Sequence, residues 1–491
     1  MNMAGKKVLV MGLGVHGGGV GVSKWLLAQG AHVTVTDLKT RQELGASIRE
    51  IEQFNASLRA NRSNLRYVLG AHRLSDILHA DLIVQNPGVP NDAPLLKLAR
   101  AKRIPIVNDT SLFFEHCPWP IIGVTGTKGK TTTAMLLHAI LNAHNHRTLL
   151  AGNLRISPLE FLLKNNNHKL PVIPPQRDPA LAVANYQLPF TRFVVLELSS
   201  WNLEGLARIK RSPSLAVITN IMPDHLNRYA SMRAYIDAKA RIFQYQGEKD
   251  IVVLNRDNPA TRALAKRAPG KVLWFSKKTT LPDTPSLLGA HNRQNIAAAV
   301  TAARALGVSE ATIARALRSF NGVPGRLETV TTVNGIRYIN DTTATTPEAT
   351  IAALEALCSK EAPTSGSERS ENASNKIGGI ILIAGGGDKK LNYKALARGI
   401  EKHVKALVLF KGSASEKILS SLRGAKRRGN LVHSIITNLT TMRSAVAAAR
   451  RHATPGDIIL LSPGATSFGL FKHEFDRGDQ FVARVKNTKG S

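Results

Sequence analysis

The 491-residue sequence is short of cysteine, of aromatic side chains and of acidic side chains. Its two cysteines, Cys117 and Cys358, can form no disulfide framework and lack the spacing of metal ligands, which excludes a disulfide-stapled secreted domain. The chain has no run of 18 or more apolar residues, so we expect no membrane span. Glycines interrupt its basic, apolar start and no small-residue cleavage site follows, so we interpret that start as a first strand and expect a cytoplasmic protein.

The shortage of acidic residues makes the chain strongly basic. There are 34 Asp and Glu against 66 Lys and Arg, which gives a net charge of +32. A basic field attracts polyanions, so nucleic acid is one interpretation. The positive residues are spread along the chain, aromatic residues make up only 5%, and no nucleic-acid-binding motif occurs. We therefore expect a solvated basic surface and no nucleic-acid partner.

The length predicts about three domains. Short β-branched runs alternate with helical stretches, which is typical of parallel α/β sheets. We expect a Rossmann-like N-terminal domain at 1–118, a central P-loop ATPase-type domain with a parallel sheet at 119–325, and a C-terminal Rossmann-like domain at 326–491. Two polar inserts, 164–179 and 359–376, are interpreted as surface loops without an assigned role.

A first glycine cluster, Gly12 to Gly17, follows an expected strand and precedes an expected helix. Glycines let a pyrophosphate approach the backbone at a helix N-terminus, and Asp37, at the end of the next strand, can accept from a ribose hydroxyl. The pattern favours a nucleotide-like ligand. It leaves open an NAD site, a site for another diphosphate and a purely structural turn.

A second loop is more specific. In "PIIGVTGTKGKTTTAMLL", Pro120 to Leu137, an apolar run leads through Gly126–Thr131 into a helical pattern. Its backbone N–H groups can surround phosphates, Lys130 can reach the outermost phosphate, and the Thr131 hydroxyl can bind Mg²⁺. Val124 stands where the plain Walker pattern has its first glycine. The sequence therefore predicts a nucleoside triphosphate site.

Further polar side chains follow expected strands of the central segment, namely Glu197 in "FVVLELSSWNL" and Asp224 with His225 in "LAVITNIMPDHLNRY". The carboxyl ends of parallel strands gather ligand groups, and a carboxylate can hold Mg²⁺. A loop acid and a satisfied core histidine are equally good interpretations of Glu197 and His225. Lys239 falls in a helical pattern, where the pattern alone predicts a solvated cation.

The third segment is rich in groups that suit a carboxylate. "YINDTTATTPEAT" contains Asp341 and Thr345, the loop "GGGDKK" contains Lys389, and "LSPGATSFGLFKHEFDRGDQF" follows the last expected strand. Small hydroxyl side chains, free N–H groups and a lysine can together bind an anionic substrate. Three nucleotide- or anion-friendly sites therefore occur in one chain.

The motifs taken together resemble the Mur ligases. The similarity is carried in order by "TGTKGKTTT", "ELSSWNL", "NIMPDH", "GAHNRQNIAAA", "GVPGRLE", "YINDTTAT" and "LSPGATSFGLFKHEFDRG", and it spares only the two inserts. Within the family, "ELSS", "NDTTAT" and the last motif look most like the members that add D-glutamate.

The resemblance implies an ATP-dependent ligase that adds D-glutamate to UDP-N-acetylmuramoyl-L-alanine through an acyl phosphate, in peptidoglycan precursor synthesis. It implies ATP and Mg²⁺ as cofactors, small-molecule substrates, a monomer, and no membrane partner. The alternatives are a ligase of this type, or one like folylpolyglutamate synthase, that adds another amino acid. Outside the class they are a nicotinamide dehydrogenase and a basic nucleic-acid-binding ATPase.

The resemblance also implies residue roles. The catalytic residues would be Lys130, His225 and Lys239. ATP would be bound by Gly126, Thr127, Lys128, Gly129, Lys130, Thr131, Thr132, Asn292, Asn295, Arg326 and Asp341. The UDP-sugar would be bound by Gly14, Val15, His16, Asp37 and Asn153. The metal would be held by Thr131, Glu197, His225 and a Lys239 carbamylated by CO₂. The amino acid would be bound by Thr345, Lys389, Ser467 and Phe468.

Two positions depart from the family pattern. Thr343 stands where many relatives have lysine, and Glu474 stands where an aromatic residue is common. Losing a cation and gaining an anion beside an anionic amino acid weakens its hold, so these two residues bear on amino-acid choice more than on the ligase chemistry.

Overall fold

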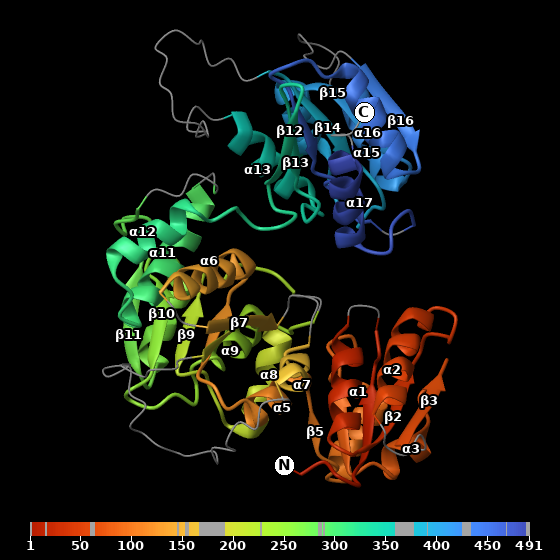
Figure 1. Ribbon diagram of the computed structural model, residues 1–491, viewed down its shortest axis with the longest axis vertical. Helices are drawn as coiled ribbons and strands as arrows, with labels where there is room; N and C mark the ends of the chain where they lie inside the picture. The colour runs from red at the N-terminus through yellow and green to blue at the C-terminus, as the bar shows by residue number, and fades with distance from the viewer. Residues whose placement is uncertain are drawn as a thin grey trace. The chain divides into compact units, whose positions relative to one another are not determined.

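The computed structural model is an α/β protein with three sheets (Figure 1). It describes residues 2–14, 17–58, 64–144, 147–152, 157–165, 192–225, 228–282, 287, 290–358, 378–389, 391–424, 434–467 and 469–487. The chain divides into two compact units, the first made of Met1–Asp283 with Ala290–Leu317 and the second of Thr284–Gly289 with Arg318–Ser491. The first unit holds two sheets and the second holds one, which confirms the three-domain α/β fold.

The polar inserts contribute little to what is described. Residues 164 and 165 end helix α7 (Leu159–Asn165), while the rest of insert 164–179 and all of insert 359–376 lie outside the described residues. No helix in the described part of the chain is both long and apolar enough to cross a bilayer.

The first sheet is parallel and has the order β3-β2-β1-β4-β5. Its strands are β1 (Lys7–Met11), β2 (His32–Asp37), β3 (Leu65–Leu69), β4 (Leu82–Gln85) and β5 (Ile106–Val107). The helices are α1 (Gly18–Ala28), α2 (Gly45–Ser57), α3 (Leu74–Leu78), α4 (Pro94–Ala101) and α5 (Asp109–His116). Strand β1 lies between β2 and β4, because the chain adds β2 and β3 on one side of β1 and then β4 and β5 on the other. The glycine cluster after β1 therefore lies at a topological switch point.

The second sheet is also parallel and has the order β11-β10-β9-β6-β8-β7. Its strands are β6 (Ile121–Thr125), β7 (Arg147–Gly152), β8 (Arg192–Glu197), β9 (Leu215–Ile218), β10 (Ile251–Asn255) and β11 (Lys271–Phe275). The helices are α6 (Lys130–Ala143), α7, α8 (Ser200–Ile209), α9 (Met232–Ala240), α10 (Pro259–Leu264), the 3₁₀ helix η3 (Ala265–Arg267), α11 (Ala290–Ala305) and α12 (Glu310–Arg318). Because β8 and β9 flank β6, the loop after β6 occupies the switch point of this sheet.

One hydrophobic core runs through both sheets of the first unit. Helix α1 packs against α7, and α5 packs against α8. Trp25 on α1 is buried, and its ring lies 4.8 Å from the ring of His116 on α5. The helices between the two sheets therefore bury apolar side chains from both.

The third sheet is mixed and has the order β12-β13-β17-β14-β15-β16. Its strands are β12 (Glu328–Val333), β13 (Ile336–Asn340), β14 (Ile380–Ala384), β15 (Val404–Phe410), β16 (Ser434–Leu439) and β17 (Ile458–Leu461). The helices are α13 (Pro347–Cys358), α14 (Lys394–His403), α15 (Ser413–Gly424), α16 (Met442–His452) and α17 (Glu474–Lys486). Among the strands described for this sheet, β12 alone pairs antiparallel, with β13. The turn between them, Asn334–Gly335, has φ of 51° and 72°, the geometry of a tight hairpin.

Both faces of the third sheet are covered. Side chains of β14 alternate, so that Leu382 packs in a core with α13, α14 and α15, whereas Ile381 and Ile383 pack in a second core with α16 and α17. This alternation follows from the two-residue repeat of a strand. Each face is apolar, which explains the continuous apolar run "IILIA".

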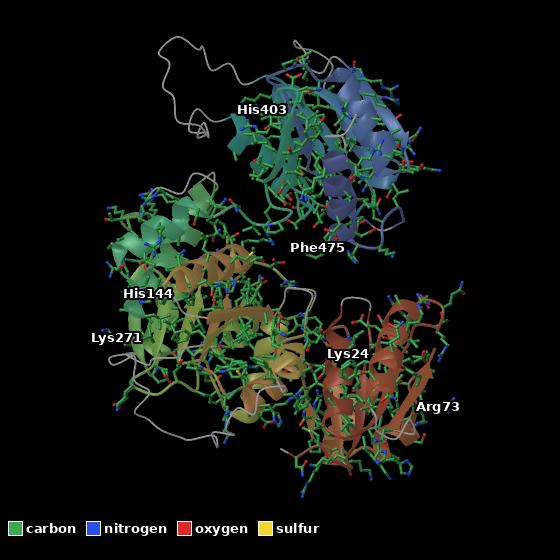
Figure 2. All side chains as sticks on the ribbon, in the orientation of Figure 1. Lys24, Arg73, His144, Lys271, His403 and Phe475 are labelled. Carbon is green, nitrogen blue, oxygen red and sulfur yellow. The ribbon has the colours of Figure 1, made fainter. Side chains whose placement is uncertain are left out.

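Exposed basic side chains are found beside each sheet. Arg73 precedes α3 and Lys271 begins β11, as Figure 2 shows, and Lys411 follows β15. The positive charge is therefore not confined to one domain.

We predict opposite effects for two glycine-to-alanine changes in the second unit. Gly335→Ala should lower the free energy of unfolding by about 1–2 kcal/mol, because a left-handed backbone disfavours a Cβ. The added Cβ would also lie 3.0 Å from Pro455. Gly399→Ala, inside α14 with no atom nearer than 3.7 Å, should raise it by about 0.5–1 kcal/mol. Urea unfolding followed by circular dichroism measures both, and equal shifts would contradict the turn geometry.

Candidate active site

The phosphate loop joins β6 to α6 and depends on two glycines. Gly126 has φ 151° and Gly129 has φ 82°. A Cβ on Gly126 would overlap the Thr219 hydroxyl, and one on Gly129 would overlap the Asn295 side chain. The loop therefore packs too closely against β9 and α11 for any other residue. Its close packing leaves the N-terminus of α6, with its backbone N–H groups, as the place for phosphates.

Hydrogen bonds from the end of β9 fix this loop. The N–H of Thr127 donates to the Asn220 carbonyl at 2.8 Å, and the N–H of Lys128 donates to the Asn220 side chain at 3.0 Å. The Thr219 hydroxyl donates to the Lys128 carbonyl at 2.6 Å. Backbone and side-chain groups of Thr219 and Asn220, in the same domain, therefore hold the phosphate loop in place. Sequence reasoning missed Thr219 and Asn220, although both directly follow an apolar strand.

Thr131 and Glu197 come together as predicted. The Thr131 hydroxyl donates to Glu197 Oε2 at 2.7 Å, and Glu197 is 2% exposed. Their proximity follows from the sheet, because Val124 on β6 pairs with Glu197 on β8. A hydroxyl and a carboxylate oxygen beside a phosphate loop are ligands that suit Mg²⁺. Thr132 is buried in the same turn of α6.

His225 does not join them in a ready-made metal cluster. Among the residues that the structure describes, no three His, Cys, Asp or Glu side chains gather closely enough to hold a metal ion. His225 lies edge-on to the Tyr235 ring, with centroids 6.0 Å apart. Burial lowers the pKa of His225, and the charges of nearby lysines lower it further against the opposing effect of Asp224. Its imidazole is therefore biased toward the neutral form, which is the form that binds metals.

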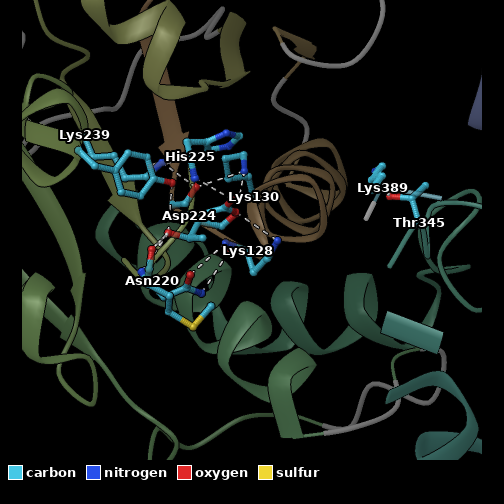
Figure 3. A network of polar contacts seen from close by, with 12 residues as sticks. Lys128, Lys130, Asn220, Asp224, His225, Lys239, Thr345 and Lys389 are labelled. Atoms are coloured by element: carbon cyan, nitrogen blue, oxygen red, sulfur yellow. Dashed lines mark hydrogen bonds and ion pairs between the residues drawn. The ribbon is translucent and has the colours of Figure 1, made fainter. Parts of the chain in front are cut away.

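Lys239 is the most perturbed side chain of the site, and the pattern-based prediction of a solvated cation was wrong. It is 2% exposed, and its Nζ donates to the Gly126 carbonyl at 2.8 Å (Figure 3). The same Nζ lies 4.8 Å from the centroid of the Tyr235 ring. Burial, with the charge of Lys130 as a second cause, lowers the pKa of Lys239 to about 7. Lys239 therefore presents a neutral, nucleophilic amine above that pH.

Two further lysines surround the loop. Lys130 Nζ donates to the carbonyls of Gly126 and Thr127 at 3.2 and 3.1 Å. Lys128 Nζ forms an ion pair with Asp224 at 3.3 Å (Figure 3). Burial raises the pKa of Asp224, but Lys128 and His225 together lower it more, so the net shift is downward. The site thus combines the ammonium groups of Lys128 and Lys130 with the carboxylate of Asp224.

Asn292 and Asn295 lie in α11 beside the loop. Asn295 Nδ2 donates to Asn292 Oδ1 at 3.1 Å, and the Asn295 carbonyl accepts from the Thr133 hydroxyl at 3.4 Å. Both asparagines are buried, and Asn295 contacts the Gly129 turn. The family resemblance assigned both to ATP, and the structure places Asn295 against the loop that would carry its phosphates, with Asn292 hydrogen-bonded to it.

In the first glycine cluster, a backbone N–H group donates a hydrogen bond to the carboxylate of Asp37, the acid predicted together with the cluster. Asp37 Oδ2 accepts from the N–H of Gly14 at 3.0 Å, and Asp37 Oδ1 accepts from the N–H of Lys39 at 2.9 Å. Gly14 and Asp37, predicted to bind the same ligand, are therefore in direct contact. Val15, His16 and Asn153, assigned to the same ligand, lie outside the described residues.

The second unit brings Asp341 next to the Arg326 segment. Asp341 Oδ2 accepts from the Ser462 hydroxyl at 2.8 Å, and its Oδ1 accepts from the N–H of Leu327 at 3.2 Å. Burial raises the pKa of Asp341 to about 7, although both hydrogen bonds and the charge of Arg326 oppose the rise. Asp341 therefore titrates near neutrality.

Two of the four residues predicted to bind the amino-acid substrate are in contact with each other. Lys389 Nζ donates to the Thr345 hydroxyl at 3.2 Å (Figure 3). Ser467 is buried, and its carbonyl accepts from the N–H of Phe471 at 3.1 Å. Phe468 lies outside the described residues. The Thr343 hydroxyl, at one departing position, donates to the Gly325 carbonyl at 2.9 Å.

Sequence reasoning missed Arg477, although it lies within a quoted motif. Arg477 is 0% exposed, and burial lowers its pKa to about 10. Its guanidinium donates to the carbonyl and hydroxyl of Thr342 at 2.8 and 3.2 Å and to the Ala465 carbonyl at 3.3 Å. It braces the Asp341–Thr345 segment against the loop after β17. Tyr235 was also missed, although it lies one helical turn before Lys239 on the same face.

Three family models match the chain in order. Residues 6–108 match the model described as Mur ligase MurD-like, N-terminal domain, residues 124–284 match Mur ligase middle domain, and residues 325–464 match Mur ligase, glutamate ligase domain. Together they cover well over half of the chain.

Curated relatives match from end to end. UDP-N-acetylmuramoylalanine–D-glutamate ligase of Roseiflexus sp. is 42% identical, with 99% of this chain and 100% of that protein covered. The enzyme of the same name from Geotalea daltonii is 34% identical, with 100% and 99% covered. The crystal structure of UDP-N-acetylmuramate-alanine ligase MurC from Thermotoga maritima covers 98% of this chain and 100% of its own at TM-score 0.58 and 19% identity. This last likeness concerns the fold alone.

The buried Lys239 should make stability depend on pH in a defined direction. Its pKa falls from 10.5 to about 7 on folding, so between these values the unfolded chain holds a proton that the folded chain lacks. The free energy of unfolding of the first unit should then rise with pH, by up to about 1.4 kcal/mol per pH unit. We predict a flatter rise in Lys239→Met, measured by urea unfolding between about pH 7.5 and 9.5 in CO₂-free buffer.

The matched control is Lys266→Met, which changes an exposed lysine on η3. This variant should keep the slope of the unsubstituted protein. The same slope in Lys239→Met as in Lys266→Met would show that Lys239 keeps its proton on folding.

Proposed function

This chain belongs to the Mur ligase family, and on that premise we propose that it joins D-glutamate to UDP-N-acetylmuramoyl-L-alanine at the expense of ATP. Relatives bearing that activity in their names are 32–42% identical over nearly the whole chain. That full-length identity is the observation that carries the substrate assignment. The protein would act as a cytoplasmic monomer on small molecules, in peptidoglycan precursor synthesis.

Amide formation from a carboxylate requires activation of that carboxylate. The terminal carboxylate of the sugar nucleotide attacks the γ-phosphorus of ATP, which forms an acyl phosphate and releases ADP. The amino group of D-glutamate then attacks the acyl carbon, and the tetrahedral intermediate expels phosphate as the nitrogen loses its proton. Such a reaction depends on positioning and charge neutralisation, because no side chain needs to bond covalently to the substrates.

The first unit supplies groups that fit ATP and Mg²⁺, which Mur ligases in general use. Gly126–Gly129 and the start of α6 would surround the phosphates, and Lys130 would move from the loop carbonyls to the γ-phosphate. Thr131 and Glu197, already 2.7 Å apart, would hold Mg²⁺. Mg²⁺ bound there neutralises charge on the phosphates. Asn292 and Asn295 would contact the adenine region.

Lys239 would hold a second metal position together with His225 after reaction with CO₂. Its neutral Nζ would attack the carbon of CO₂ and lose a proton to the solvent, which would leave a carbamate anion. The lowered pKa supports this step, because an ammonium group has no lone pair with which to attack. Burial then keeps the carbamate from water.

The remaining roles rest on the family resemblance and on local geometry. Gly14 and Asp37, in contact with each other, would bind the UDP moiety with Val15, His16 and Asn153. Thr345 and Lys389, also in contact, would bind the D-glutamate with Ser467 and Phe468. Arg326 and Asp341 would act on ATP from the second unit.

The first experiment measures phosphate release from ATP and Mg²⁺ with UDP-N-acetylmuramoyl-L-alanine across a panel of D- and L-amino acids. We expect release only with the sugar nucleotide and D-glutamate together. Lys130→Ala should release none while its circular dichroism stays unchanged, because the γ-phosphoryl group loses its cation.

Each contrary outcome identifies a different error. Release with another amino acid would keep the ligase chemistry and implicate Thr343 and Glu474 in a changed choice. Release without the sugar nucleotide, stimulated by RNA or DNA, would favour a nucleic-acid-binding ATPase. Near-normal turnover by Lys130→Ala would overturn the phosphate-loop assignment.

The carbamate has its own prediction. With ¹³C-bicarbonate, the protein should give a carbamate signal in ¹³C NMR that Lys239→Ala lacks and Lys266→Ala retains. Lys239→Ala should lose ligase activity, and a short carboxylic acid such as acetate should restore part of it by filling the vacated space. An active Lys239→Ala variant, or a signal that survives the change, would leave Lys239 an unmodified lysine.

A further inference from the structure

A cavity lies in the central domain, and no residue of the phosphate loop lines it. It has a volume of about 570 Å³ and is bordered by α8, α9, η3 and the segment after α9. The lining that matters here consists of Arg233, Ile236, Asp237, Arg241, Tyr245 and Arg267. Pockets for small ligands in proteins typically measure about 300–1,000 Å³, so the cavity is large enough for a metabolite.

The charge of this lining is unbalanced, with three arginines against one aspartate. Asp237 is paired already, because its Oδ1 lies 2.7 Å from Arg267 Nη1. Within the described part of the chain, no hydrogen bond or ion pair is found for the guanidinium group of Arg233 or Arg241. Two arginines therefore face the cavity without a protein anion to neutralise them.

The position of these arginines adds to the positive potential. Arg233 lies in the first turn of α9, where the helix dipole is already positive and a cation is unfavourable. Arg241 is near Arg208, whose pKa is lowered by burial first and then by the charges of Arg100 and Arg241. An anion in the cavity would relieve both repulsions.

The lining is not only charged. Ile236 and the Tyr245 ring supply apolar surface, and Asp237 can accept a hydrogen bond from a hydroxyl or a ring N–H. Guanidinium groups bind phosphate oxygens in pairs of parallel hydrogen bonds. We propose that this cavity binds a phosphorylated metabolite of about nucleotide size, with Arg233 and Arg241 on its phosphate groups.

The cavity and the candidate active site lie on different faces of one helix. Arg233, Ile236 and Asp237 follow helical spacing on one face of α9, while Tyr235 and Lys239 follow it on the other. Lys239 reaches the Gly126 carbonyl, so a ligand bound to the first face contacts the helix that positions Lys239. The proposed site is therefore distinct from the phosphate loop that would hold ATP, and the inference does not depend on the ligase reaction.

Arginine labelling with phenylglyoxal, followed by peptide mass spectrometry, tests the location in the unsubstituted protein. Inorganic pyrophosphate and UMP are the probes, and each should slow the labelling of Arg233 and Arg241 severalfold. Arg262 on α10 is exposed and does not line the cavity, so its labelling should not change. Equal slowing at all three arginines, or at none, would overturn the proposal.

Equilibrium dialysis with pyrophosphate gives the second measurement. The Arg233→Ala, Arg241→Ala double variant should bind one molecule fewer than the unsubstituted protein, while Arg262→Ala should bind the full number. Circular dichroism checks that the double variant is folded. An unchanged stoichiometry in the double variant, or protection by a single-stranded oligonucleotide but by neither small probe, would contradict a metabolite site.

Discussion

The carbonyl oxygen of Gly126 accepts hydrogen bonds from two lysines, and much of the candidate site depends on this. Lys130 Nζ lies 3.2 Å from it and Lys239 Nζ lies 2.8 Å from it. Lys239 is the more buried of the two amines, and its burial first and the charge of Lys130 second lower its pKa, so that it loses its proton more readily. The backbone can present this carbonyl only because residue 126 has no Cβ to meet Thr219. The absence of a Cβ at residue 126 therefore permits both the turn of the phosphate loop and the contact of its carbonyl with Lys239 on α9.

In the second unit, hydrogen bonds to neutral groups hold two buried ionisable side chains, Arg477 and Asp341. Arg477 donates to backbone and hydroxyl oxygens of Thr342, and Asp341 accepts from Ser462 and from a backbone N–H. These contacts fix neighbouring residues of one segment from two sides. The same segment carries Thr345, whose hydroxyl accepts from Lys389. Removing a partner would leave a buried polar group without its hydrogen bond, so the segment is specified more tightly than its apolar contacts alone would require.

Local patterns in the sequence were sufficient to predict the elements that depend on residues close together in the chain. The apolar run, small-residue loop and helical pattern predicted β6, the phosphate loop and α6, and the parallel sheet then placed Glu197 beside Thr131. The burial of Lys239 was not predictable from its helix, because its Nζ contacts the Gly126 carbonyl of the phosphate loop, which lies far away in the sequence. The antiparallel β12 had a visible signal, Asn-Gly between two β-branched runs, that a βα alternation obscured.

The two departures from the family pattern have local explanations in the second unit. The Thr343 hydroxyl donates to the Gly325 carbonyl, so this side chain holds the segment that leads into Arg326. Glu474 lies in the first turn of α17, where an acid is favoured by the helix dipole, and its carbonyl accepts from the Thr342 hydroxyl. Thr343 and Glu474 thus both stabilise the local structure of the chain. Neither residue by itself therefore indicates a substrate amino acid other than D-glutamate. Under the proposed function, the choice of D-glutamate would then depend on Lys389, whose Nζ donates to the Thr345 hydroxyl at 3.2 Å.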